Sequence, residues 1–146
     1  MQARQNDYFK LAEPGVKHLF ALEGAFKNGP LEPKCCTLSS YVLADQFLRF
    51  CIHLHTTEAL KDGEEPMRLY LLTGWREATL YSRRERAALA WTEALTNVAQ
   101  TGAPDEDWAL IEAAFTAEER SWLSLAISAI NLWNRLQVGF RATHPA

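Results

Sequence analysis

The stretch 116–140, TAEERSWLSLAISAINLWNRLQVGF, decides the fold class. It opens with a capping box, Thr116-Ala117-Glu118-Glu119, in which the hydroxyl and carboxylate side chains satisfy each other's exposed backbone N–H groups. Apolar residues follow at helical spacing, on one face at Trp122, Leu125, Ala126, Ala129, Trp133 and Leu136 and on a second at Leu123, Ile127 and Ile130. The stretch therefore predicts the longest helix of the chain, either deeply buried or shared with another subunit.

The rest of the chain divides into helices at prolines, glycines and a second capping box. One helix is predicted after Pro14, with Val16, Leu19, Phe20 and Phe26 in its buried stripe and Asn28-Gly29-Pro30 at its end. Others are expected from about Pro33 to Phe50, from about Cys51 to Asp62-Gly63, from Pro66 to near Gly74, after the box Ser82-Arg83-Arg84-Glu85, and from Ala103-Pro104-Asp105 through Leu110. No alternating strand pattern competes with these helices. The sequence therefore predicts an all-α chain, a single domain over 1–146 with about six to seven helices.

Composition excludes several classes of partner. The formal net charge is −3, and acidic and basic residues are mixed along the chain, which argues against binding to nucleic acid or to an anionic membrane. The N-terminal MQARQNDYFK is too polar for a signal peptide, and no apolar run is long enough to span a bilayer, so we expect a cytoplasmic protein. Three cysteines argue against a structural disulfide framework and leave open a reactive thiol.

The segment Cys51-Ile52-His53-Leu54-His55 is the strongest candidate for chemistry. Cys51 and His55 are four residues apart, so they share one helix face. Cys51 also lies near a predicted helix start, where the backbone dipole and free N–H groups favour a thiolate. An imidazole at this spacing can take the thiol proton or protonate a leaving group. The pair is therefore suited to attack on a peroxide O–O bond.

Other interpretations of these residues stay open. A buried cysteine is usually an apolar filler, and a histidine one turn away is usually a surface or capped side chain. A metal site formed by Cys51, His53 and His55 is disfavoured, because only two of these ligands share a face. The vicinal pair Cys35-Cys36 is more often inert than functional. We expect the five tryptophans, Trp75, Trp91, Trp108, Trp122 and Trp133, in the core, and Asn131 and Asn134 bonding a neighbouring helix rather than lining a pocket.

Several longer blocks resemble the alkyl hydroperoxidase D-like and carboxymuconolactone decarboxylase family. These blocks are RLYLL (68–72), WRE (75–77), ERAALAW (85–91), EALT (93–96), NLWNRL (131–136) and GFR (139–141). The resemblance extends over most of the chain from Tyr8 onward. It implies an all-α, cofactor-free and usually oligomeric protein. Active relatives carry a CxxC pair followed by a histidine and reduce hydroperoxides by dithiol–disulfide cycling, whereas others decarboxylate a lactone.

The resemblance assigns roles and also reveals a departure. Cys51 matches the second, peroxide-attacking cysteine, and His55 matches the histidine. The first cysteine of the pair is expected at the position of Leu48, and a proton-relay glutamate at the position of Cys36. The chain as printed therefore holds half of the redox pair. A lone Cys51 still forms a sulfenic acid, which then needs an external thiol for reduction.

The family pattern is missing within residues 35–50, and a shifted reading frame restores it. Written as TGC TGC ACC TTG TCA AGC TAC GTG CTA GCC, residues 35–44 with one added leading C read LLHLVKLRAS in the next frame. Two further single-base insertions turn 45–51 into QINFCAFC, which places a cysteine three residues before Cys51. The restored segment has 17 residues, against 16 printed between Lys34 and Cys51. We hypothesise that residues 35–50 are a frame-slipped reading of an intact CxxC segment.

Three functional hypotheses follow. The first is a thiol-dependent hydroperoxidase, with a hydroperoxide and a thiol or dithiol reductant as its small-molecule partners. The second is a lactone decarboxylase relative in which His55 handles protons and Cys51 is idle. The third is a catalytically inactive oligomeric family member, which Leu48 would favour. In each case we expect a homo-oligomer. The helix over 116–140 carries apolar residues on two faces, which is more apolar surface than one contact within the chain would bury.

Overall fold

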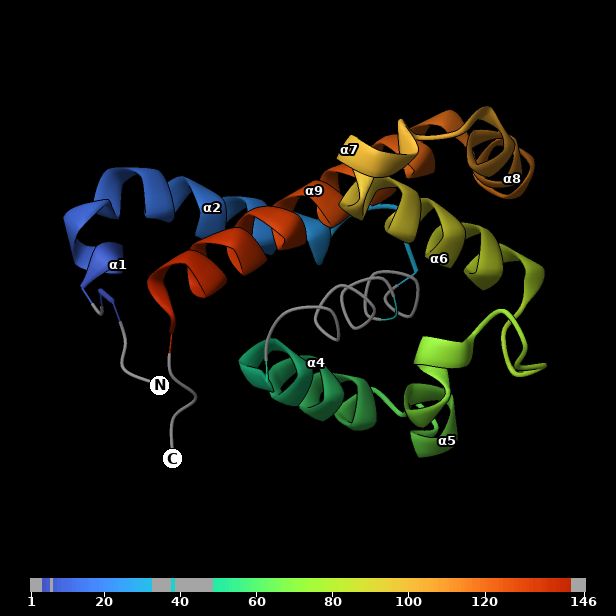
Figure 1. Cartoon of the computed structure of the whole chain (residues 1–146), viewed down its shortest axis with the longest axis horizontal. Helices are drawn as coiled ribbons and strands as arrows, with labels where there is room; N and C mark the ends of the chain where they lie inside the picture. The colour runs from blue at the N-terminus through green and yellow to red at the C-terminus, as the bar shows by residue number, and fades with distance from the viewer. Residues whose placement is uncertain (1–3, 6, 33–37, 39–48, 143–146) are drawn as a thin grey trace.

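The computed structural model describes residues 4–5, 7–32, 38 and 49–142, and the regular elements among them are all helices. They are α1 (Tyr8–Leu11), α2 (Glu13–Phe26), α4 (Arg49–Lys61), α5 (Pro66–Tyr70), the 3-10 helix η1 (Leu72–Gly74), α6 (Arg83–Thr96), α7 (Val98–Thr101), α8 (Asp105–Ala114) and α9 (Ala117–Phe140). In Figure 1, α2 and α9 run alongside each other, whereas α4 and α5 lie together at the opposite side of the molecule. The all-α prediction is confirmed.

Local signals fix the helix starts where the sequence predicted them. Both capping boxes form: Ser82 Oγ accepts from the Glu85 backbone N–H at 3.2 Å, and Thr116 Oγ1 accepts from that of Glu119 at 3.2 Å. The two glutamates return the bond to the N-cap backbones. Pro14 lies in the first turn of α2, where its missing N–H costs nothing.

Tertiary packing changes other boundaries. The helix expected from Pro66 to near Gly74 is interrupted at Leu71, which separates α5 from η1. The helix expected through Leu110 continues to Ala114, because its last turn places the fully buried Ile111 in the core. The one-turn helices α1 and α7 were not predicted. The helix expected from Pro33 to Phe50 falls outside the described residues except at Leu38 and at the start of α4.

Helix α6 is the centre of the structure because it contributes to both hydrophobic clusters. Its residues Ala87, Ala88, Trp91 and Ala94 pack with Leu31, Ile111, Phe115, Leu123 and Ile127, mainly from α8 and α9. Its residues Leu89 and Ala90 pack with Leu38, Ala59, Leu69, Leu72, Trp75 and Tyr81, mainly from α4, α5 and η1. The alanines let neighbouring helices approach closely on either side. Ala59 is 1% exposed and anchors α4 to the second cluster.

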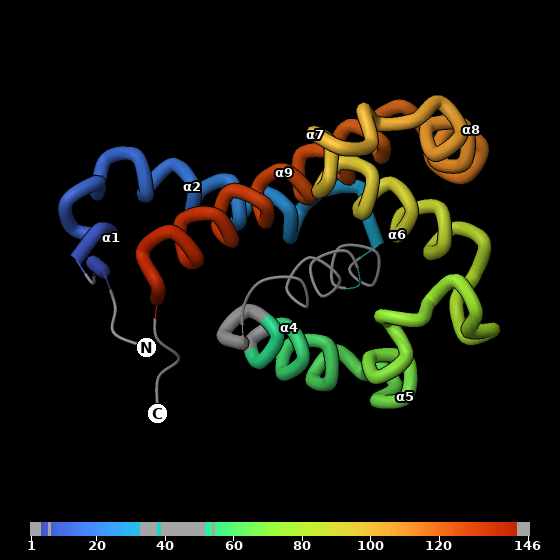
Figure 2. The backbone as a smooth tube through the Cα atoms, in the orientation of Figure 1, coloured from blue at the N-terminus to red at the C-terminus, as the bar shows by residue number. Residues whose placement is uncertain are grey.

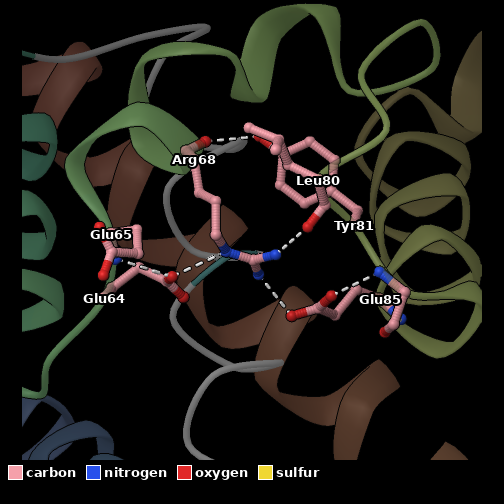
Figure 3. A network of polar contacts seen from close by, with 7 residues as sticks. Glu64, Glu65, Arg68, Leu80, Tyr81 and Glu85 are labelled. Atoms are coloured by element: carbon pink, nitrogen blue, oxygen red, sulfur yellow. Dashed lines mark hydrogen bonds and ion pairs between the residues drawn. The ribbon is translucent and has the colours of Figure 1, made fainter.

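A polar network fixes the chain after α4 against the start of α6 (Figure 3). Arg68 of α5 bonds Glu64 through Nε at 2.7 Å and Glu85 through Nη2 at 2.5 Å, and it also donates to the carbonyl of Leu80. The Tyr81 hydroxyl donates to the Arg68 carbonyl at 2.5 Å. Burial raises the pKa of Glu85, but bonds from Ser82 and Arg68 outweigh it and lower the pKa overall. The network therefore sets where α4 lies relative to the core.

Two aromatic residues expected in the core lie at the surface. Phe20 is 59% exposed rather than part of the buried stripe of α2. It stacks on Phe9 at 6.1 Å and packs against Trp133 at 5.5 Å, so its neighbours cover one side of the ring. Trp108 is 39% exposed and packs edge-on against Trp91, with the Arg120 guanidinium over its ring.

The two ends of the described chain lie close together (Figure 2). Tyr8 of α1 stacks on Phe140 at the end of α9, with ring centroids 4.6 Å apart. The Arg4 backbone N–H donates to the Phe140 carbonyl at 2.9 Å. These contacts hold α1 and α2 against the C-terminal half of α9.

Candidate functional site

Helix α4 carries both residues that the sequence selected. Cys51 lies in the first described turn of α4 and His55 lies one turn later, so the backbone places them on the same helix face. The side chain of Cys51 falls outside the described part of the structure, as do Cys35, Cys36 and Leu48. His55 is therefore the residue of this pair whose side-chain surroundings the structure describes.

The His55 side chain is largely buried and contacts one carboxylate. It is 15% exposed, and its Nδ1 lies 3.4 Å from Oε2 of Glu58, which is 56% exposed. Burial lowers the pKa of His55 and outweighs the opposing effect of Glu58, which raises it. The imidazole is therefore neutral near pH 7. In the tautomer that the Glu58 contact favours, with the proton on Nδ1, Nε2 is the ring atom that carries the lone pair.

A second carboxylate, which sequence reasoning missed, reaches this region from α2. Glu23 accepts a hydrogen bond of 2.9 Å from Nε1 of Trp133 on α9. Burial raises the pKa of Glu23, the Trp133 bond lowers it, and the charge of Glu58 raises it again. The hydrogen bond between Trp133 and Glu23 therefore joins α9 to α2.

One signal in the sequence points to Glu23. Val16, Phe20 and Glu23 follow one another at i, i+4 and i+7, so Glu23 occupies a position of the apolar stripe of α2. A carboxylate at such a position is desolvated unless it is paired, and it usually has a specific partner. That partner is Trp133, 110 positions away in the chain, which no local pattern identifies.

Asn131, Trp75 and Trp91 bond neighbouring elements and have structural roles. Asn131 is buried and donates through Nδ2 to Thr96 Oγ1 and to the Ile127 carbonyl, each at 3.1 Å, so it joins α9 to α6 as expected. The indoles of Trp75 and Trp91 are buried and donate to Glu93 and Ser124. Asn134 is buried as well.

The described residues offer no metal centre. No three His, Cys, Asp or Glu side chains among them are grouped to hold an ion. His53 is exposed, whereas His55 is largely buried. Two residues apart on a helix, they project roughly 200° apart.

None of the described helices combines the length and the apolar character needed to cross a membrane.

Comparison with known proteins places this geometry in context. Residues 21–94 match the model of the Carboxymuconolactone decarboxylase family, a range that includes Glu23, Cys51, His55 and Glu58. The uncharacterized protein YdfG of Bacillus subtilis (strain 168) is 31% identical over 132 residues, which cover 90% of each chain. A crystal structure of a protein of unknown function from Agrobacterium tumefaciens, named "Putative Antioxidant Defence Protein AhpD", superposes with a TM-score of 0.91. That protein is 36% identical, and the match covers 99% of each chain.

Proposed function

The chain belongs to the carboxymuconolactone decarboxylase family, and on that premise we propose that it is a thiol-dependent hydroperoxidase with Cys51 as nucleophile and His55 as proton partner. The supporting observation is His55 itself: a largely buried imidazole with a lowered pKa, one helical turn after a cysteine. A neutral imidazole is the form that takes a proton from a thiol. The name of the Agrobacterium tumefaciens relative points to the same class of activity.

The reaction divides into two steps. The Cys51 thiol gives its proton to His55, and the thiolate attacks one peroxide oxygen, which breaks the O–O bond. The departing alkoxide takes the proton from the imidazolium and leaves as an alcohol, while Cys51 becomes a sulfenic acid. An external thiol then condenses with the sulfenic acid and releases water. A second thiol reduces the mixed disulfide and returns Cys51 to its starting state.

A peroxide-consumption assay with an alkyl hydroperoxide and a dithiol reductant tests this function. Cys51→Ser should lower the rate to that of reductant alone, since the oxygen nucleophile is not activated at neutral pH. Cys35→Ser is the matched control and should leave the rate unchanged. A Cys51→Ser protein as active as the parent would eliminate the proposal. Turnover of a γ-carboxylactone that survives Cys51→Ser would favour the decarboxylase alternative, which needs only the neutral His55.

The frame-slip hypothesis sharpens this assay. We propose to compare the printed chain with one in which residues 35–50 are replaced by the 17-residue restored segment, LLHLVKLRASQINFCAF. A cysteine three residues before Cys51 can resolve the sulfenic acid within the chain, so the restored protein should turn over faster at low reductant concentration. Equal rates at every reductant concentration would argue against the hypothesis. If the measured mass of the intact protein equals that of the printed sequence, a sequencing error within residues 35–50 is excluded.

The homo-oligomer is also a proposal, with a second copy of this chain as the partner. On α9, Leu123 and Ile127 are buried, whereas Leu125 and Leu132 are 43% and 38% exposed and lie two turns apart on one face. Light scattering at micromolar concentration should give at least a dimer. The variant Leu125→Lys/Leu132→Lys should shift the mass toward the monomer, and Leu110→Lys, at an exposed position of α8, should not. A monomeric parent protein would disprove the proposal.

A further inference from the structure

One face of α9 lies at the surface along most of the length of the helix, and we call it the α9 seam. It consists of the exposed residues Glu118, Ser121, Leu125, Ser128, Leu132 and Arg135. These residues follow one another at alternating intervals of three and four positions, whereas the opposite face buries Leu123 and Ile127 in the core. Alternating three- and four-residue spacing is the pattern that keeps a helix face turned toward a second helix lying alongside it.

The two serines of the seam can be covered without losing a hydrogen bond. Ser121 Oγ and Ser128 Oγ donate to the backbone carbonyls four residues earlier, at 2.9 and 2.8 Å. Because both hydroxyl protons are paired within α9, a second helix on top of them leaves no donor unsatisfied. The adjoining Leu125 and Leu132 are 43% and 38% exposed. The middle of the seam therefore alternates small side chains with large apolar ones.

The two ends of the seam carry opposite charges. Glu118 lies in the first turn of α9, and Arg135 lies near its C-terminal end. Neither has an ion-pair partner among the described residues, whereas the neighbouring Glu119 is paired with Arg84 at 2.6 Å. Two parallel copies of the seam would place each charge beside its own kind, and two antiparallel copies place opposite charges together. Charge therefore favours an antiparallel partner with the same seam.

Two antiparallel seams are complementary at every position. The intervals between the six residues read the same in both directions, so a twofold axis midway between Leu125 and Ser128 places each residue opposite another residue of the seam. The opposed pairs are Glu118 with Arg135, Ser121 with Leu132, and Leu125 with Ser128. Each leucine thus meets a serine, which lets the side chains of the two helices interdigitate.

We propose that the α9 seam binds a second copy of this chain, antiparallel, about a twofold axis between Leu125 and Ser128. The inference rests on the proposed homo-oligomer and deepens it, because it names the surface, the orientation and the pairs that specify both. The same surface is used on both copies, so the contact closes at two subunits. The twofold axis makes each pair occur twice, and any change in one residue is therefore felt twice.

Charge reversal tests the orientation. Glu118→Arg places a positive charge opposite Arg135 on both sides of the axis and should raise the dimer dissociation constant by roughly tenfold. Arg135→Glu should weaken association to a similar extent. The double variant Glu118→Arg/Arg135→Glu exchanges the two charges and should restore the association of the parent. Analytical ultracentrifugation over a series of protein concentrations measures each dissociation constant.

The matched control is Glu106→Arg. Glu106 is an exposed carboxylate in the first turn of α8, as Glu118 is in α9, so the variant makes the same change in net charge and at a helix N-terminus. It should leave association unchanged. Far-UV circular dichroism confirms that each variant stays helical, and recovery in the double variant would show that the single variants failed to associate rather than to fold.

The outcomes separate this inference from the proposals before it. If the parent is a dimer or larger and both single variants associate as tightly as the parent, the seam is wrong and the homo-oligomer stands. Weakened single variants without recovery in the double variant would overturn the antiparallel orientation. A parent that is monomeric at every concentration would overturn both proposals. The hydroperoxidase is decided separately by Cys51→Ser, because Cys51 and His55 lie on α4 and outside the seam.

Discussion

Two clusters of glutamates surround a base in this structure, and they behave in opposite ways. Glu64 and Glu85 surround Arg68, all three are at most 16% exposed, and the pKa of Glu85 is lowered despite its burial. Glu58 contacts His55 and acts on Glu23, and the pKa of Glu23 is raised while that of His55 is lowered. The charged form is thus favoured for Glu85 and disfavoured for Glu23.

The central base accounts for the difference. A guanidinium keeps its charge at every physiological pH, so each carboxylate beside Arg68 gains a permanent partner. A buried imidazole whose pKa is lowered carries no permanent charge, so Glu58 has no permanent cation as its partner. The first cluster holds helices together, and the second lies where we propose that His55 exchanges a proton with Cys51.

The largest effect should come from removing the permanent cation. Arg68→Met leaves Glu64 and Glu85 without their partner in a nearly buried position, which should cost roughly 3 kcal/mol of unfolding free energy. Urea unfolding at pH 7 measures this cost. The control is Arg76→Met, because Arg76 is 60% exposed in its ion pair with Glu93 and should cost at most about 1 kcal/mol. If the two variants lost the same unfolding free energy, the buried ion pairs of Arg68 would contribute no more than the exposed pair of Arg76.

A smaller effect should follow from neutralising one glutamate of the same cluster. Glu85 has a lowered pKa in the folded state, so its stabilisation is present above the ordinary Glu range and is lost as pH falls through the folded-state value. Glu85→Gln should therefore destabilise the protein at pH 7 by about 1.5 kcal/mol and have a smaller effect in acid. Urea unfolding at several pH values gives the profile. Destabilisation that does not change with pH would mean that the charge of Glu85 is irrelevant.

The smallest effect concerns His55. Its folded-state pKa is lowered, so the stability that burial of the neutral ring permits is present above the ordinary histidine pKa and declines as pH falls below it. His55→Gln should remove this decline, a change of less than about 1 kcal/mol between neutral and mildly acidic pH. His18→Gln, at an exposed position of α2, is the control and should retain the decline. A decline that persists in His55→Gln would assign it to another group.

The sequence predicted the parts of the fold that depend on neighbouring residues. The capping boxes at Ser82 and Thr116 and the proline at the start of α2 act within one helical turn, so their patterns are sufficient. The break at Leu71 and the exposure of Phe20 and Trp108 depend on residues far away in the chain, which no local pattern contains. The family resemblance is confirmed by the match over 21–94 and by the solved relative.

The candidate site also has a part that follows from local sequence and a part that depends on residues far apart in the chain. The four-residue spacing of Cys51 and His55 is local and identified the face of α4. The hydrogen bond from Trp133 to Glu23 joins two helices far apart in the chain and required the structure. The roles of Cys51 and His55, and the missing partners at Leu48 and Cys36, remain predictions.

The most direct test of the account is to find which sulfur reacts with peroxide. The protein is treated with an alkyl hydroperoxide in the presence of dimedone, which traps sulfenic acids, and is then digested with trypsin. Cleavage after Arg49 separates Cys51, in peptide 50–61, from Cys35 and Cys36. The account predicts a dimedone adduct on Cys51 that forms more slowly in His55→Gln. An adduct confined to Cys35 or Cys36, or no adduct under conditions where peroxide is consumed, would contradict it.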